Sequence, residues 1–268
     1  MKDKVVIITG ASSGIGRALA FEMGKRGAVV VIAARSVEKL NEIEAQLKSS
    51  GVKALAVKTD VSIEADCRNL IDTTVNNFGR IDILINNAGI SMRALFEKTD
   101  LAVIRRLMDV NFWGTVYCTK YALPWLLKTK GSLVGVSSIA GYKGLPGRTG
   151  YSASKYAIQG FLETVRIENM KKGLHVLIAC PGFTASNIRN SALSADGSLQ
   201  GESPRNEDSM MKPEKVAVKI ADAIKRKNKI LVMTIVGKLT VALDKIFPFF
   251  MDRMVYNQMA KEPDSPFK

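Results

Sequence analysis

Two residues capable of acid–base chemistry lie one helical turn apart in the middle of the chain. Tyr151 and Lys155, in the segment YSASK, are four residues apart, so on a helix they share one face. An ammonium beside a phenol favours the phenolate, and we therefore predict that Lys155 lowers the pKa of Tyr151 from its usual value of about 10. A tyrosine tuned in this way can exchange a proton near neutral pH. Because YxxxK also occurs between ordinary surface residues, its meaning depends on what else the chain supplies.

A glycine-rich segment near the start of the chain has the spacing of a phosphate-binding turn. Residues 9–16 read TGASSGIG and lie between an apolar run, KVVIIT, and a stretch with helical spacing. Glycine lets the chain turn tightly and approach a pyrophosphate, and the free amides and dipole of the helix start attract that anion. We predict dinucleotide binding here, the alternative being a glycine turn without a ligand. The predicted contacts are Gly10, Ser12, Ser13, Gly14, Ile15 and Gly16.

The end of the second predicted strand indicates which dinucleotide would bind. A site that prefers NAD places an acidic residue there for the ribose hydroxyls, but this chain has Ala34 and Arg35, with Arg17 just after the glycine turn. A guanidinium can bind the 2′-phosphate of NADP through charge-assisted hydrogen bonds, whereas a carboxylate would repel it. We therefore predict NADP(H), the alternative being two surface arginines.

Polar and glycine residues follow three later strands at the point where each strand ends. The segment NNAG (residues 86–89) follows the fourth predicted strand, SS (137–138) the fifth and PG (181–182) the sixth. The carboxyl ends of parallel strands meet at one edge of a sheet, and open α/β sheets bind ligands at that edge. With Tyr151 following shortly after Ser138, this convergence predicts an active site there.

The elements that must position these residues alternate between strand and helix. This alternation predicts a single domain of the α/β class, a Rossmann-type doubly wound parallel sheet with helices on both faces. We expect strands at residues 4–9, 28–34, 54–57, 81–85, 133–136, 175–179 and 229–235, and helices at residues 17–26, after Ser36, and at 63–78, 99–127, 151–170 and 213–227.

Residues 191–209 interrupt this alternation. They are rich in Ser, Gly, Asn and acidic residues and show almost no apolar periodicity. Long loops inside compact domains are usually functional or disordered. We therefore divide the domain into a dinucleotide-binding and catalytic core (1–190), a mobile loop on the substrate side (191–212), and a C-terminal part with the last strand and an amphipathic tail (213–268).

The tail at residues 237–259 has two interpretations. Apolar residues alternate there with charged ones, Pro248 should kink or break the segment, and residues 210–268 hold 12 Lys or Arg against 6 acidic residues, a net charge of +6. Such a basic amphipathic stretch could lie on a membrane surface. We favour a pair of short helices that pack over the substrate cleft or a partner subunit, because amphipathic helices usually face a core.

Composition excludes several classes of function. The net charge of +14 is spread along the chain without interleaved aromatic residues, which argues against nucleic-acid binding and fits attraction to anionic small molecules. The three cysteines are far apart and form no CxxC, so we expect buried thiols in a reducing compartment. No His/Cys cluster indicates a metal, and His175, the only histidine, is expected to be structural. We expect no signal peptide and no spanning helix, and a cytoplasmic protein that could associate with a membrane surface.

Together these motifs resemble the short-chain dehydrogenase/reductase family. The resemblance covers about residues 4–185 and rests on TGxxxGxG at 9–16, NNAG at 86–89, Ser138, YxxxK at 151–155 and the Pro-Gly pair. It implies that Tyr151 is the general acid in reduction and the general base in oxidation, and that Ser138 polarises the substrate carbonyl. It implies that Lys155 lowers the pKa of Tyr151 and bonds the nicotinamide ribose, and that Asn111 holds a water in a proton relay.

The same resemblance implies further cofactor contacts and an assembly. Asp60 would contact the adenine, and Ser186 stands where many members have threonine. Members of this family commonly associate through the helices that hold Asn111 and Tyr151, so a homodimer or homotetramer is implied. The implied cofactor contacts beyond the glycine turn are Arg35, Asp60, Val61, Asn87, Ala88, Gly89, Tyr151, Lys155, Pro181, Gly182, Phe183 and Thr184.

The function predicted from these observations is reversible hydride transfer between NADPH and a ketone or secondary alcohol. The loop and the apolar tail favour a lipophilic ketone, such as a steroid or a long-chain keto lipid. The alternative is a cofactor-binding scaffold or sensor without turnover. Intact Asn111, Ser138, Tyr151 and Lys155 argue against that alternative, because a protein without catalysis has no chemical need for all four.

Overall fold

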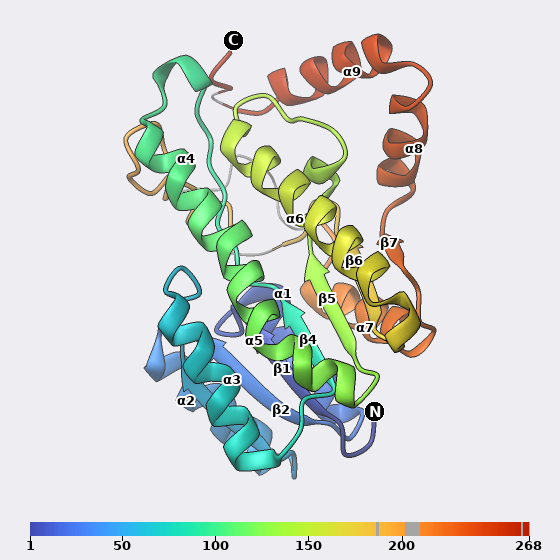
Figure 1. Cartoon of the computed structure of the whole chain (residues 1–268). Coiled ribbons are helices and arrows are strands. Elements are labelled where there is room, and N and C mark those ends of the chain that lie inside the picture. Colours follow the sequence, from blue (N-terminus) through green and yellow to red (C-terminus); the bar gives the residue numbers. More distant parts are fainter. Residues whose placement is uncertain (186–187, 202–209, 264, 268) are drawn as a thin grey trace.

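The strands form one parallel sheet, as predicted. The computed structural model describes residues 1–185, 188–201, 210–263 and 265–267. Within this part of the chain seven strands lie in the order β3-β2-β1-β4-β5-β6-β7 (Figure 1), which confirms the doubly wound α/β class. They are β1 (Val5–Thr9), β2 (Val29–Ala34), β3 (Ala54–Lys58), β4 (Ile83–Asn86), β5 (Ser132–Val136), β6 (His175–Cys180) and β7 (Ile230–Val232).

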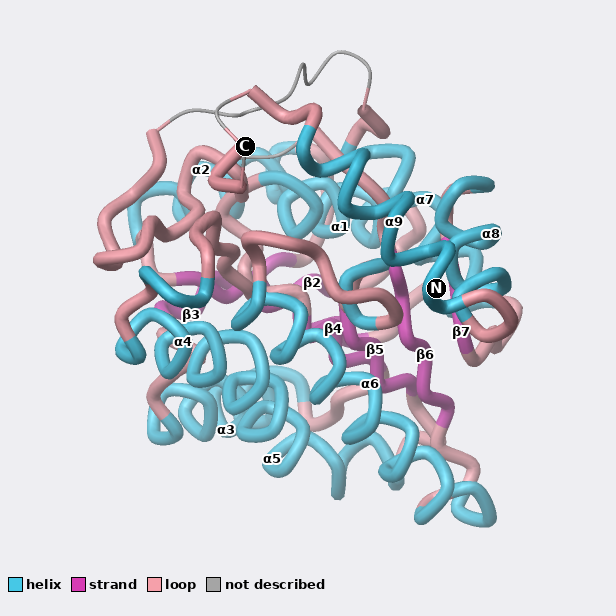
Figure 2. Tube along the Cα trace, turned by 90° about the horizontal axis from the view of Figure 1, so that it is seen from above, coloured by secondary structure: helices cyan, strands magenta, loops and turns pink. Residues whose placement is uncertain are grey.

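Helices cover both faces of the sheet, because the strands are apolar on both sides (Figure 2). Along β1, Val6 and Ile8 pack with one layer of helices, and Val5 and Ile7 pack with the other. Burial of each such side chain contributes about 1.5–3 kcal/mol. The first layer holds α1 (Gly14–Lys25), α2 (Val37–Ser49) and α7 (Pro213–Lys225), and the second holds α3 (Glu64–Phe78), α5 (Gly114–Lys128) and α6 (Thr149–Glu168).

The winding of the sheet fixes where a ligand can bind. From β1 the chain builds outward through β2 to β3, then returns to place β4 on the other side of β1. The loops after β1 and β4 therefore leave in opposite directions and open a crevice at the carboxyl ends of these strands. The two termini of the chain lie at opposite ends of the molecule (Figure 1). The C-terminal helices lie beyond the carboxyl ends of the strands, on the same side as the crevice.

The predicted helix at residues 99–127 contains a change of helix type. It consists of α4 (Leu101–Leu107), a π-helical turn at Met108–Trp113, and α5. A π turn holds an extra residue, and such turns are frequent at functional sites. The turn carries Asn111, whose fully buried side chain reaches Ser154 on α6. Three short 3₁₀ turns also occur, at Phe96–Lys98, Ile139–Gly141 and Met170–Lys172.

The amphipathic tail forms two helices, α8 (Ile235–Asp244) and α9 (Pro248–Ala260). Pro248 starts α9, where its missing N–H costs nothing, so the predicted break at this proline is confirmed. Two ion pairs tie both helices to the core, since the buried Lys143 after β5 contacts Asp244 at 2.5 Å and Asp252 at 2.6 Å.

His175 is held by two hydrogen bonds, and the cysteines are buried, as expected of them. The ring of His175 lies between Ser132 and Asn228: Nδ1 is 3.0 Å from the serine hydroxyl and Nε2 is 2.8 Å from the backbone oxygen. A neutral ring that donates from Nε2 and accepts at Nδ1 satisfies both contacts. Burial lowers the pKa of His175, which also favours this neutral form. Cys67, Cys118 and Cys180 are all buried free thiols.

Candidate active site

A large cavity lies over the carboxyl ends of the strands. Its volume is about 1870 Å³, and its lining joins the glycine turn, the ends of β2, β4, β5 and β6, and both C-terminal helices. Every predicted cofactor contact lines it. The predicted residues in the lining are Gly10, Ser12, Ser13, Gly14, Ile15, Gly16, Arg35, Asp60, Val61, Asn87, Ala88, Gly89, Ser138, Tyr151, Lys155, Pro181, Gly182, Phe183 and Thr184.

The glycine turn has the close backbone packing that a pyrophosphate cradle requires. Gly10 adopts a left-handed conformation with φ of 64°. A Cβ atom on Gly16 would lie 2.2 Å from the carbonyl oxygen of Gly10, so only glycine lets α1 begin this close to β1. The amides at the start of α1 therefore face the cavity end of the sheet, a geometry that fits a bound dinucleotide.

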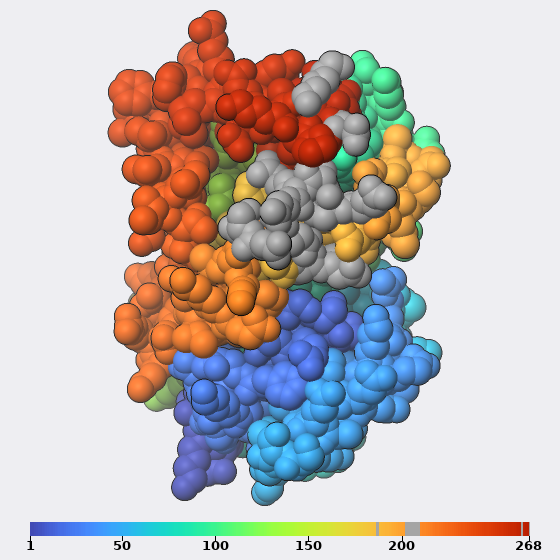
Figure 3. Space-filling model, turned by 180° about the vertical axis from the view of Figure 1, so that it is seen from behind, coloured from blue at the N-terminus to red at the C-terminus, as the bar shows by residue number. Residues whose placement is uncertain are grey.

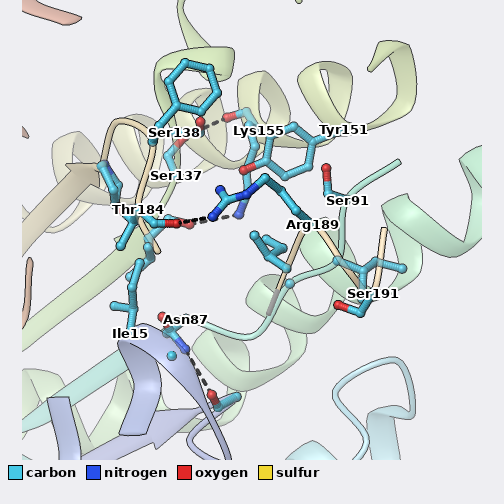
Figure 4. Close-up of a pocket in the computed structure, with 18 of the residues that line it drawn as sticks. Ile15, Asn87, Ser91, Ser137, Ser138, Tyr151, Lys155, Thr184, Arg189 and Ser191 are labelled. Carbon is cyan, nitrogen blue, oxygen red and sulfur yellow. Dashed lines mark hydrogen bonds between the residues drawn. The ribbon is translucent and has the colours of Figure 1, made fainter. Parts of the chain in front are cut away.

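Thr9 and Asn87 fasten this turn to the neighbouring strand. The hydroxyl of Thr9 accepts hydrogen bonds from the backbone N–H groups of Asn87 and Ala88, at 3.0 and 3.1 Å. The Asn87 side chain donates to the carbonyl oxygens of Thr9 and Gly10, at 2.9 and 3.2 Å (Figure 4). Asn87 therefore braces the crevice between β1 and β4 in addition to lining it, and Thr9 is a positioning residue that sequence reasoning missed.

The end of β2 presents two cations to the cavity. Arg35 and Lys39 both line it, together with Ser36, the N-cap of α2. Arg17 does not line it: this side chain is exposed on α1, where it donates to Gln46 at 3.1 Å and covers the ring of Phe21. Of the two arginines predicted to bind the 2′-phosphate, Arg35 lines the cavity and Arg17 does not. Lys39 was not predicted from the sequence.

Three of the predicted catalytic residues come together at one end of the cavity. Tyr151 and Lys155 project from the first turns of α6, and Ser138 follows β5 directly (Figure 4). Ser138 forms a side-chain hydrogen bond with Tyr151 and accepts one from the N–H of Ala140 at 3.1 Å. The Nζ atom of Lys155 lies 5.6 Å from the centre of the Tyr151 ring. Two hydroxyls and an ammonium therefore share one site.

Burial, rather than Lys155, dominates the acidity of Tyr151. Burial raises the pKa of Tyr151 above its usual 10, while the hydrogen bond with Ser138 and the charges of Arg148 and Arg189 act in the opposite direction. The predicted lowering by Lys155 is not found. Its Nζ atom donates instead to the carbonyl oxygen of Val136 at 2.9 Å. A neutral phenol at physiological pH is the form that can act as an acid.

Lys155 titrates in an accessible range. Its side chain is enclosed by protein, and this burial lowers its pKa from 10.5 to about 8. Between those two values the folded state binds fewer protons than the unfolded state, so this lysine makes folding more favourable as the pH rises across that interval. Below about pH 8 the ammonium is present and supports negative charge nearby.

The predicted ketone reduction should therefore lose rate as the pH rises through about 8. Deprotonation of Lys155 removes the positive charge beside the site, and kcat/KM should fall about tenfold for each further pH unit. The measurement is a pH profile, from pH 6 to 10, of the predicted NADPH-dependent reduction. Lys155→Arg, which keeps its charge, should show no such fall near pH 8. A wild-type profile that stays flat to pH 10 would contradict this assignment.

Asn111 is close to these groups without lining the cavity. Its side chain donates to the carbonyl oxygen of Ile90 at 3.0 Å and to the hydroxyl of Ser154 at 2.8 Å, and accepts from the N–H of Ile90 at 2.8 Å. These bonds fix the loop after β4 against α6. The water relay implied by the resemblance stays a prediction, and Ser186 lies outside the described residues.

A buried ion cluster that sequence reasoning missed lies in the cavity lining. Glu262, which lines the cavity after α9, accepts from Arg148 at 3.0 Å and lies 3.7 Å from Arg93. The ion pair joins positions 114 residues apart in the chain, so no local pattern could indicate it. Residues 202–209 of the loop predicted at 191–212 lie outside the described residues. The residues of this loop that line the cavity are Ser191, Leu193, Leu199, Met210, Met211 and Lys212.

Comparison with known proteins identifies the family. The sequence pattern of the family described as short chain dehydrogenase matches residues 4–197. The chain belongs to the short-chain dehydrogenase family. This match includes the glycine turn, Ser138 and the Tyr151–Lys155 pair, all of which line the cavity described above.

Several curated short-chain dehydrogenases are similar to this chain over its core. "11-beta-hydroxysteroid dehydrogenase A" of Sesamum indicum is 44% identical over 187 residues, which is 69% of this chain and 53% of the relative. The protein of the same name from Arachis hypogaea is 44% identical over 199 residues, which is 73% of this chain and 57% of the relative. The chain thus spans little more than half the length of these relatives.

Solved structures show the same fold. A short-chain dehydrogenase/reductase from Burkholderia phymatum, in complex with NAD, has a TM-score of 0.83 at 24% identity and covers 93% of this chain and 95% of its own. An alcohol dehydrogenase from Thermococcus sibiricus, complexed with 5-hydroxy-NADP, has a TM-score of 0.78 at 25% identity and covers 87% of this chain and 96% of its own.

Proposed function

We propose that this protein is an NADP(H)-dependent oxidoreductase that interconverts a ketone and a secondary alcohol. The observation that carries the proposal is the convergence of Ser138, Tyr151 and Lys155 at one end of a cavity whose other end is the glycine turn. When bound, a nicotinamide dinucleotide would supply the hydride. The membership of the family and the fit of the glycine turn to a pyrophosphate support this proposal.

The residues of the site have separate tasks in the proposed reaction. As the carbonyl carbon gains the hydride, its oxygen gains the electron pair of the C=O π bond, and Tyr151 delivers its O–H proton to that oxygen. Ser138 donates a hydrogen bond to the same oxygen, and the ammonium of Lys155 stabilises the charge on the tyrosinate that remains. In the direction of alcohol oxidation, Tyr151 takes the proton back.

The proposed substrate is a lipophilic ketone, such as a steroid or a long-chain keto lipid. The cavity, at about 1870 Å³, has room for a large substrate beside a dinucleotide. Apolar side chains from distant parts of the chain line it, and the curated relatives named above are hydroxysteroid dehydrogenases. These apolar lining residues include Ile90, Leu145, Leu193, Leu199, Val236, Val255 and Met259.

The proposal is tested by following NADPH consumption with a panel of ketones that ranges from small and polar to steroidal. We expect turnover, with kcat/KM rising with the apolar area of the ketone. Equal rates on small polar ketones would overturn the lipophilic substrate. Tight NADPH binding without turnover of any ketone would instead favour the scaffold or sensor.

Arg35 should decide the preference for NADPH. Replacing Arg35 by alanine removes a cation that lines the end of β2, and a charge-assisted bond to a phosphate contributes about 1.5–3 kcal/mol. The KM for NADPH should therefore rise roughly 10- to 100-fold, while the KM for NADH stays nearly constant. Arg17→Ala is the matched control and should change neither value, because Arg17 lies outside the cavity lining. Equal effects of Arg35→Ala on both cofactors would contradict NADP specificity.

The homodimer or homotetramer and the cytoplasmic location stay predictions. The helices implied in assembly do carry exposed aromatic side chains: Trp113 is 44% exposed and stacks on Tyr117, with ring centres 5.6 Å apart. Sedimentation of the purified chain tests the assembly, and Trp113→Glu should dissociate an oligomer that uses this face.

A further inference from the structure

The C-terminal helices leave a concentrated apolar surface uncovered. Among the described residues, nine of the 21 large hydrophobic side chains that are exposed lie between residues 235 and 256. Phe249 is 85% exposed and Ile235 is 78% exposed. Exposed apolar side chains gathered on two neighbouring helices in this way indicate an interaction site. We call the nine side chains the apolar rim: Ile235, Val236, Leu239, Ile246, Phe247, Phe249, Phe250, Met254 and Tyr256.

The apolar rim is not an exposed remnant of the core, because these helices have a separate inward face. On α9, Met251 and Met259 are buried, and Val255 and Met259 line the cavity. Phe249, Phe250 and Met254 point away from that face, and so α9 is apolar on two sides. The predicted packing over the cleft accounts for the inner side only. Figure 3 shows α8 and α9, in red, at the upper end of the molecule.

The charges around the apolar rim that lie outside ion pairs, within the described residues, have one sign. Residues 235–260 contain two acidic residues, Asp244 and Asp252, and both contact Lys143, which is buried. The three basic residues of the same segment, Lys238, Lys245 and Arg253, are exposed and, within the described part of the chain, form no ion pair. The surface beside the apolar rim is therefore cationic.

We propose that the apolar rim docks on the surface of an anionic lipid bilayer, with Lys238, Lys245 and Arg253 at the headgroups. Exposed phenylalanines and basic side chains on short helices are the combination that inserts into the headgroup region. Among the helices of the described residues, none is long and apolar enough to cross a membrane. The helices α8 and α9 then border both the cavity and the docking surface, and Val236 belongs to both.

A second copy of the chain fits this surface less well. A two-fold contact through the apolar rim would bring the three cations of each copy against those of the other, and like charges in close contact oppose association. A bilayer that contains anionic lipid supplies both the apolar interior and the opposite charge. The net charge of +14 acts in the same direction.

Vesicle flotation of the full chain, without cofactor or substrate, tests this proposal separately from the proposed function. The wild-type protein should float with vesicles of phosphatidylcholine and phosphatidylserine, and less with phosphatidylcholine alone. Phe249→Glu combined with Phe250→Glu should lower the partition coefficient at least tenfold. Ile167→Glu, at a 61% exposed position on α6, is the matched control and should bind like wild type.

Two further measurements separate the electrostatic contribution to vesicle binding from the apolar one. Each charge removed in Lys238→Gln, Lys245→Gln and Arg253→Gln should weaken binding to the anionic vesicles roughly fivefold. Added salt should weaken binding of the unchanged protein, which tests the electrostatic part without any variant. Absence of flotation of the wild type, or equal loss in Ile167→Glu, would overturn the proposal. So would a wild-type dimer that the double glutamate variant dissociates and that does not float.

Discussion

Replacing Tyr151 by phenylalanine should lower kcat/KM for the proposed NADPH-dependent ketone reduction by about 10²- to 10⁴-fold. The variant keeps the ring that borders the cavity and loses only the hydroxyl that forms a hydrogen bond with Ser138. The proton that the developing alkoxide needs must then come from water, and one hydrogen-bond donor to that oxygen is lost. Steady-state kinetics with a ketone that the wild-type protein reduces measures the fall in kcat/KM. The affinity for NADPH, measured by fluorescence titration, should change little.

Tyr156→Phe is the matched control for this experiment. Tyr156 lies on the same helix but is half exposed, and its hydroxyl donates to the backbone carbonyl of Tyr142 rather than facing the cavity. We expect its kcat/KM to stay within about twofold of wild type, which is near the accuracy of such comparisons. Full activity of Tyr151→Phe would remove Tyr151 from the reaction, and equal losses in the two variants would indicate a general effect on α6.

Replacing Gly16 by alanine should impair both folding and cofactor binding. The new Cβ atom would lie 2.2 Å from the carbonyl oxygen of Gly10 and 2.6 Å from the side-chain nitrogen of Asn87. Because the nearest atom belongs to the backbone, the first turn of α1 must move away from β1. Overpacking of this kind costs about 1–3 kcal/mol in the free energy of unfolding. Displaced helix amides should also weaken NADPH binding at least tenfold.

Urea unfolding and NADPH titration measure these two effects of Gly16→Ala. Gly144→Ala is the control, because a Cβ atom there would meet no atom within 4 Å and the residue does not need a left-handed conformation. Its stability and NADPH affinity should be close to those of wild type. If Gly16→Ala binds NADPH normally, the glycine turn is a packing feature and the dinucleotide is held elsewhere.

Local patterns were sufficient to predict the class of fold and the motif residues that line the cavity. Apolar runs such as VVIIT predict strands buried on both faces, and their alternation with helical periodicity allows few topologies. Once the strands are parallel, their carboxyl ends meet, so the segments after β1, β4, β5 and β6 had to share one edge. Proline 248 likewise predicted the break between α8 and α9, because a proline N–H is missing wherever the residue stands.

The properties that depend on long-range contacts were decided by the tertiary structure alone. Lys155 was placed correctly beside Tyr151, but its Nζ atom donates to Val136, and burial sets the direction of both pKa shifts. Desolvation depends on every element that surrounds a group, and spacing along one helix does not report it. The tertiary structure alone also decided the ion pair between Arg148 and Glu262 and the exposed apolar side of α9. Each depends on which distant segment lies opposite, whereas periodicity along the chain records only that a face is apolar or charged.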